Sequence, residues 1–180
     1  MRSLLRRIAL AAIIAPAAAG AVSMFATPAE AAPAVPTTSS ATSAASAASA
    51  ASAAERGMQA DILRLTNEQR AAAGCAPLTA NDQLTEAART HSAWMGSTGT
   101  FSHVGDAGSS FVARAQAAGF AAPSAENIAY RYKTAEAVMD GWMRSPGHRA
   151  NILSCASKTL GVGVVTAADG ITYYTQDFGY

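Results

Sequence analysis

Hydrophobic and polar positions along the chain follow two different periodicities. Beyond residue 55, apolar residues recur every three or four positions, beginning with Met58 and Ile62, and Gly74 can end this first helix. Near the C-terminus, β-branched and aromatic residues gather in two runs joined by Asp169-Gly170, a dipeptide typical of hairpin turns. Helices first and a hairpin last predict an α+β fold.

Three further helices follow from the same pattern. Asn81 or Asp82 can cap the second, "SSFVARAQAAGF" predicts a short third, and Thr134 can cap the fourth. The stretch after Glu126 is a candidate for one more strand. The apolar stripe of the second helix comprises Leu84, Ala87, Ala88, His91 and Met95. His91 lies on this stripe, so we expect it to form a hydrogen bond inside the core.

Residues 1–31 have the organisation of a secretory signal peptide. Three arginines precede an apolar run over 8–25, and an A-x-A cleavage site follows at 29–31. The alternative is an uncleaved anchor helix, because the apolar run is nearly long enough to span a bilayer. We expect a protein that is secreted or associated with the cell envelope, attached to a membrane only if this segment is retained.

Residues 32–54 differ from the rest of the chain in composition. They consist almost entirely of Ala, Ser, Pro and Thr, so they have little apolar surface to bury and cannot offset the entropy of ordering. We predict a flexible tether here. The remaining segment, 55–180, has about 125 residues, which is enough for one compact domain.

Charge and cysteine content narrow the function classes. Removing residues 1–31 takes three arginines and one glutamate from the 13 basic and 12 acidic residues, leaving 10 and 11 and a net charge of −1. This balance gives no electrostatic basis for binding nucleic acid, and we expect a monomer. Two cysteines, Cys75 and Cys155, suggest a disulfide in an exported protein, with a reactive thiol as the alternative.

Three short stretches contain residues that could carry chemistry. "FSHVG" contains His103, "SAENIAY" contains Glu126, and "SPGHRAN" contains His148. More than twenty residues separate each from the next, so the sequence alone does not bring them together. Taken singly, a loop histidine is usually solvated or capping, and Glu126 is a surface carboxylate or a partner of Arg114 or Arg131.

These stretches gain weight from their order along the chain. "LTNEQRAAAGCAPLT", "FSHVG", "AENIAY", "WMRSPGHRANILS" and "YYTQDFG" succeed one another from about Ile62 to Gly179. Together they resemble bacterial members of the CAP superfamily, named for cysteine-rich secretory proteins, antigen 5 and pathogenesis-related proteins. The resemblance implies an α-β-α sandwich with a small antiparallel sheet between helical layers.

The resemblance also implies a shallow cleft that gathers two histidines and two acidic residues. His103, Glu126 and His148 match three of them. The place of the fourth, three residues after the helix tryptophan, is taken by Ser145, so the site loses one negative charge. Asn127 and Ser145 are expected to line the cleft.

The turn before His148 can be understood in this setting. Pro146 would end the fourth helix and Gly147 would let the backbone bend, so that the imidazole projects into the cleft. Two imidazoles can bind Zn²⁺ or a similar divalent ion with modest affinity. Glu126 would be either a third ligand or the hydrogen-bond acceptor that fixes a histidine tautomer.

Three functions are compatible with this site. We expect a binding protein that holds a divalent ion at His103, His148 and Glu126, with a lipid, peptide or glycan as the cleft ligand. A metal-assisted hydrolase acting on peptides or cell-wall material, with Glu126 as general base, is the second, although no H-E-x-x-H motif is present. An interaction module with a vestigial cleft is the third. Nucleophilic catalysis is disfavoured, because no serine lies in a G-x-S-x-G elbow.

Overall fold

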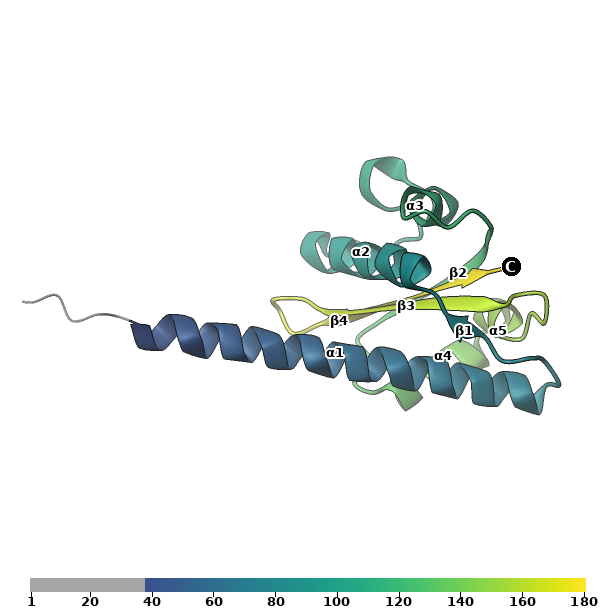
Figure 1. Cartoon of the computed structure of the whole chain (residues 1–180), viewed down its shortest axis with the longest axis horizontal. Coiled ribbons are helices and arrows are strands. Elements are labelled where there is room, and N and C mark those ends of the chain that lie inside the picture. Colours follow the sequence, from purple (N-terminus) through teal and green to yellow (C-terminus); the bar gives the residue numbers. More distant parts are fainter. Residues whose placement is uncertain (1–37) are drawn as a thin grey trace, which may run out of the picture. The chain divides into compact units, whose positions relative to one another are not determined.

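The computed structural model of the protein describes residues 38–180. The predicted signal segment, 1–31, and the first residues of the predicted tether lie outside this range. Within it, five α-helices, one short 3₁₀ turn (Asp106–Gly108) and four strands follow one another (Figure 1). They are α1 (Thr38–Ala72), β1 (Thr79–Ala80), α2 (Asp82–Thr98), α3 (Phe111–Ala117), β2 (Pro123–Tyr130), α4 (Ala135–Arg144), α5 (Pro146–Ile152), β3 (Thr159–Thr166) and β4 (Thr172–Gly179).

The sheet lies between two helical layers, which confirms the predicted α+β sandwich. Its strand order is β1-β3-β4-β2. α2 packs on β3 and β4 from one face, whereas α1 packs on β3 from the other, together with α4 (Figure 1). β3 and β4 form the predicted hairpin, with Gly170 in the left-handed region at φ 79°. β1 runs parallel to β3, so the sheet is mixed rather than fully antiparallel.

Helix α1 begins earlier than the hydrophobic pattern predicts. Residues 38–54 are helical in the structure, whereas their composition predicts a flexible tether. Alanine has the highest helix propensity, and no glycine or proline interrupts the chain between Thr38 and Arg56, which explains the difference. No helix within 38–180 is long and apolar enough to cross a membrane.

Two glycines of β3 allow α2 to lie directly against the sheet. A Cβ added at Gly161 would be 2.1 Å from the carbonyl carbon of Leu84, and one at Gly163 would be 2.3 Å from that of Ala88. No side chain fits between the two backbones at either point. The helix that carries His91 is therefore held against β3 by contact with the strand's own backbone.

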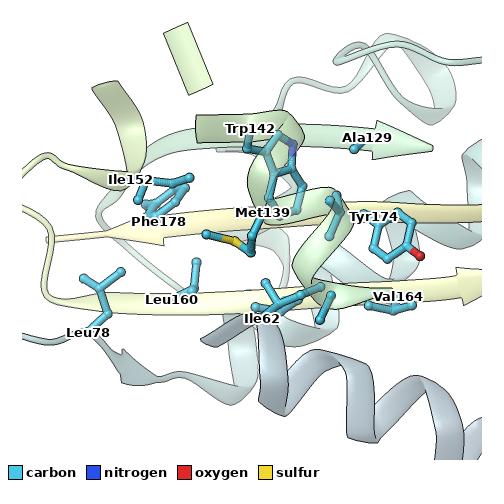
Figure 2. Packing of buried hydrophobic residues seen from close by; sticks show 13 residues of the cluster. Ile62, Leu78, Ala129, Met139, Trp142, Ile152, Leu160, Val164, Tyr174 and Phe178 are labelled. Carbon is cyan, nitrogen blue, oxygen red and sulfur yellow. The ribbon is translucent and has the colours of Figure 1, made fainter. Parts of the chain in front are cut away.

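The main hydrophobic core fills the opposite face, between the sheet and the helices α1 and α4. Trp142 of α4 and Ile62 of α1 both point toward the strands (Figure 2). The strands contribute Leu160, Val162, Val164, Tyr174 and Phe178, all of which are buried. This core anchors α4, and through it the segment that precedes His148.

A disulfide and one buried arginine fix the segment after α5 to the end of α1. Cys75 and Cys155 form the predicted disulfide. Arg70, which is fully buried, donates hydrogen bonds to the backbone carbonyl of Ile152, the last residue of α5, and to those of Ser154 and Ser157 beyond it. The two links together hold the C-terminal end of α5 in place.

The turn before His148 differs from the prediction. Pro146 is the first residue of α5, so it starts a new helix as well as ending α4. Proline is favoured at this position because its missing N–H would have no helical partner there. Gly147 lies within α5 and has no positive φ. His148 therefore projects from the first turn of a helix and not from a bend.

Candidate functional site

Glu126 lies on β2, which begins at Pro123. The sequence pattern predicted a strand only after Glu126, so β2 starts earlier than expected. Its side chain is only 1% exposed. Oε1 lies 2.8 Å from Nδ1 of His103, and Oε2 accepts a hydrogen bond of 2.5 Å from Nη2 of Arg114. Burial acts to raise the pKa of Glu126, but the bond from His103 and the charge of Arg114 outweigh it and hold the pKa below its ordinary value. Glu126 is therefore a carboxylate.

This arrangement selects one tautomer of His103. A carboxylate accepts a hydrogen bond, so Nδ1 of the neutral imidazole carries the proton and Nε2 keeps its lone pair. The His103 side chain is 56% exposed. His103 is thus anchored through Nδ1, which leaves Nε2 as its free ligand atom.

Arg114 also holds the loop that carries His103. Its Nη1 donates to the carbonyl oxygens of His103 and Ser109, at 3.2 and 2.8 Å. The sequence allowed either Arg114 or Arg131 as the partner of Glu126, and in the structure the partner is Arg114. It lies on α3, whose N-terminus is capped by the Ser110 side chain, and it is only 9% exposed.

His91 supports the same loop from α2, as a buried structural histidine. Its Nε2 lies 2.9 Å from the carbonyl oxygen of Ser102, the residue before His103. A carbonyl oxygen only accepts, so Nε2 carries the proton. Burial lowers the pKa of His91, which favours the neutral ring. The predicted hydrogen bond inside the core is confirmed.

His148 approaches the same end of β2 from α5. Nδ2 of Asn127 donates to its backbone carbonyl at 3.2 Å, while Asn151 donates to Oδ1 of Asn127 at 2.8 Å. Burial lowers the pKa of His148, and the neighbouring His103 adds to this. Asn127 was expected to line the cleft, but it is fully buried and fixes the backbone of α5 instead.

Asp177 is a member of this cluster that the sequence patterns did not identify. It is paired with Glu126 across β2 and β4, and it is fully buried. Neither of its carboxyl oxygens has a hydrogen-bond partner among the described residues. Burial raises its pKa well above the ordinary value, and the charge of Glu126 adds to this. The only available signal was a carboxylate inside an otherwise buried strand pattern, "YYTQDFG".

A groove of about 450 Å³ follows the outer edge of β2, beside His148. Trp142 forms part of its wall and donates from Nε1 to the carbonyl oxygen of Ile128 at 3.2 Å. Phe101, which is 45% exposed, contacts Tyr130 with ring centroids 4.5 Å apart. The remaining lining residues are Ala129, Arg131, Tyr132, Gly141 and Ser145. Ser145 and His148 are thus among the described lining residues of this groove, whereas His103 and Glu126 are not.

The fit of a metal ion to these residues is limited. No group of three or more His, Cys, Asp or Glu side chains within 38–180 is arranged to hold one. Both oxygens of Glu126 are already engaged, by His103 and Arg114. Of its two expected roles, the geometry favours the acceptor that fixes the His103 tautomer. An ion here would have at most two imidazole nitrogens and water as ligands.

Comparison with known proteins identifies the family. The sequence model of the CAP family, the cysteine-rich secretory protein family, matches residues 63–178. The chain belongs to the CAP family. An extracellular protein containing an SCP domain from Bacillus anthracis has 32% sequence identity and a TM-score of 0.63, over 69% of this chain and 41% of that one.

Other relatives agree with this assignment of the CAP domain. Two Bacillus subtilis (strain 168) proteins match: the uncharacterized membrane protein YlbC is 37% identical over 121 residues, and the uncharacterized protein YkwD is 35% identical over 118. These matches cover 67% and 65% of this chain but only 34% and 45% of the relatives. This chain therefore spans less than half of either relative. A cysteine-rich secretory protein from Staphylococcus aureus, 21% identical with a TM-score of 0.59 over 69% of this chain and 38% of that one, shares the fold.

Proposed function

We propose that this CAP domain is an extracellular binding module. The groove beside β2 takes a small ligand, and His103 and His148 hold a weakly bound divalent ion near its end. An extracellular location is supported by the disulfide, by the signal-like segment 1–31 and by the description of the Bacillus anthracis relative as extracellular. The groove volume of about 450 Å³ is typical of small-molecule sites.

The observation that carries the ion site is the contact between Glu126 and His103. A carboxylate behind Nδ1 orients the ring, increases its basicity and leaves Nε2 available, as carboxylates do behind metal-binding histidines. A metal ion binds the neutral form of an imidazole. Burial lowers the pKa of His148, which favours this neutral form. An ion bound here would supply positive charge and exchangeable water positions beside the groove.

The same geometry makes hydrolysis with Glu126 as general base the weaker proposal. A general base needs a free oxygen close to the water that it activates. Both oxygens of Glu126 accept hydrogen bonds from protein groups, its side chain is 1% exposed, and its pKa is lowered. Each of these features reduces its ability to take a proton from water.

Calorimetric titration with ZnCl₂ at pH 7.5 tests the ion site. Wild-type protein should bind one ion, and His103→Ala or His148→Ala should abolish the binding. Glu126→Gln retains both imidazoles, and it should weaken binding about 10- to 100-fold, as expected for loss of a supporting carboxylate. A wild type that shows no binding heat at millimolar Zn²⁺ would rule out the ion site and leave the groove as the candidate binding surface.

A further inference from the structure

Arg131 occupies an unusual position at the end of the groove. Its backbone N–H continues the β2–β4 ladder by donating to the carbonyl oxygen of Thr172 at 2.9 Å. Its φ is 68°, in the left-handed region that residues with a Cβ rarely adopt. Such conformations persist only where the surroundings enforce them, and they are concentrated at functional positions. The chain turns here from β2 toward α4, which places Arg131 at the rim of the groove.

The guanidinium group of Arg131 is held by an aromatic ring and has no acidic partner. Its central carbon lies 5.1 Å from the centroid of the Tyr130 ring, which in turn contacts Phe101. Stacking of this kind orients the guanidinium and leaves its N–H groups free to donate. No carboxylate within residues 38–180 forms an ion pair with Arg131, unlike Arg114 and Arg144, which bind Glu126 and Asp140.

The groove as a whole is complementary to an anionic ligand. Its described lining residues include one guanidinium and one imidazole, those of Arg131 and His148, and no aspartate or glutamate. Between these two groups the walls are mainly apolar and aromatic, with Phe101, Ile128 and Trp142 among them. A ligand that matches this surface has a flat apolar body and a negative charge at one end.

The edge of β2 is poorly suited to an extended peptide. Strand addition needs free backbone acceptors along the edge. The carbonyl oxygen of Ile128 already accepts from Nε1 of Trp142, and that of Glu126 accepts from Nδ2 of Asn151 at 3.3 Å. Two successive outward carbonyls are thus occupied by side chains. This favours a small molecule as the occupant of the groove.

We infer that the groove binds a small molecule with a flat apolar body and one anionic group, and that Arg131 binds the anionic group. The inference rests on the proposed ligand-binding role of the groove and specifies the ligand class. Arg131 is then a specificity-determining residue, because a fork of N–H donors recognises a carboxylate, sulfonate or phosphate with charge-assisted hydrogen bonds.

Two fluorescent probes of nearly the same shape test this. 8-Anilinonaphthalene-1-sulfonate carries a sulfonate, and N-phenyl-1-naphthylamine lacks it. Wild-type protein should bind the sulfonate probe about tenfold more tightly than the neutral probe, which is the effect of one charge-assisted contact. Arg131→Gln should abolish this preference while leaving the neutral probe unaffected. Arg131→Asn, which suits the left-handed backbone, should behave in the same way. Phe101→Ala should weaken both probes.

Arg149→Gln is the matched control, since it removes one positive charge from α5 outside the described lining of this groove. It should bind both probes as the wild type does, and near-UV circular dichroism should show native packing in every variant. If both probes bind equally and Arg131→Gln changes neither, the anionic-ligand inference is overturned while the groove remains a binding site. If neither probe binds, the groove proposal and the inference are both overturned.

Discussion

Asp177 lies directly across from Glu126 in the β2–β4 ladder, and both carboxyl groups are buried. His103 and Arg114 both form hydrogen bonds with Glu126, whereas neither carboxyl oxygen of Asp177 has a hydrogen-bond partner within residues 38–180. Two buried carboxyl groups this close cannot both ionise without a large cost, so one of them retains a proton. The pKa of Asp177 is raised and that of Glu126 is lowered, so Asp177 is the carboxyl group that holds a proton more tightly.

This pair predicts a pH dependence of stability. The pKa of Asp177 is raised on folding above 3.8, so the folded state binds this proton more tightly than the unfolded state. Its contribution is present below the unfolded pKa and is lost as pH rises through the folded pKa. The free energy of unfolding of wild type should therefore fall relative to that of Asp177→Asn as pH rises above about 4. Urea unfolding at several pH values measures this. Asp61→Asn changes an exposed carboxylate and is the control: its free energy of unfolding should follow that of the wild type across the pH range. If the difference in free energy of unfolding between wild type and Asp177→Asn does not change with pH, the expectation is contradicted.

The ion pair of Arg114 and Glu126 predicts strong coupling between the two residues. Arg114→Met leaves a buried carboxylate without its cation and should cost about 3 kcal/mol of unfolding free energy. Adding Glu126→Gln removes that charge, so the double variant should be more stable than the sum of the two single changes predicts. A double-mutant cycle by urea unfolding measures the coupling, and additive effects would show that the two side chains act independently.

The disulfide predicts a large effect of its removal. Cys75 and Cys155 close a loop of 80 residues, which corresponds to about 4.5 kcal/mol in the chain-entropy model. The variant with both cysteines changed to alanine should lose up to this amount but keep the fold, because Arg70 still binds three carbonyls at and beyond the end of α5. Denaturant unfolding measures the loss of stability, and the far-UV circular dichroism spectrum shows whether the fold is kept. A loss below about 1 kcal/mol would mean that the unfolded chain is not restricted by the bond.

The contact between α2 and β3 predicts that Gly163 tolerates no side chain. Gly163→Ala would force a methyl group onto the Ala88 backbone, and it should destabilise the protein by at least about 2 kcal/mol. Gly57→Ala is the matched control: its Cβ would meet nothing within 4 Å, and alanine is the better helix former, so stability should rise by about 0.5–1 kcal/mol. Thermal unfolding of the two variants measures these changes in stability. If Gly163→Ala and Gly57→Ala change the stability equally, the close packing of α2 on β3 is contradicted.

Much of the fold was predictable because its signals are local. The spacing of Met58 and Ile62 marks α1, Asn81 caps α2 through the amide N–H of Leu84, and Gly170 turns the final hairpin. One wrong boundary and one missed helix have equally local explanations. Alanine-rich residues 38–54 lack an apolar face but have high helix propensity, and Pro146 both ends one helix and begins the next.

The sequence by itself determined most of the elements and their order, most of the residues able to carry chemistry and, through resemblance, the family. Only the tertiary structure decided which of these residues meet. Asp177 faces Glu126 because a strand register joins positions about fifty residues apart, and Glu126 binds Arg114 rather than Arg131 because α3 brings Arg114 to this strand. Such a register depends on the packing of the whole sheet against both helical layers, and no local pattern contains that information. The charge of a buried group is decided in the same way, by neighbours that folding brings to it.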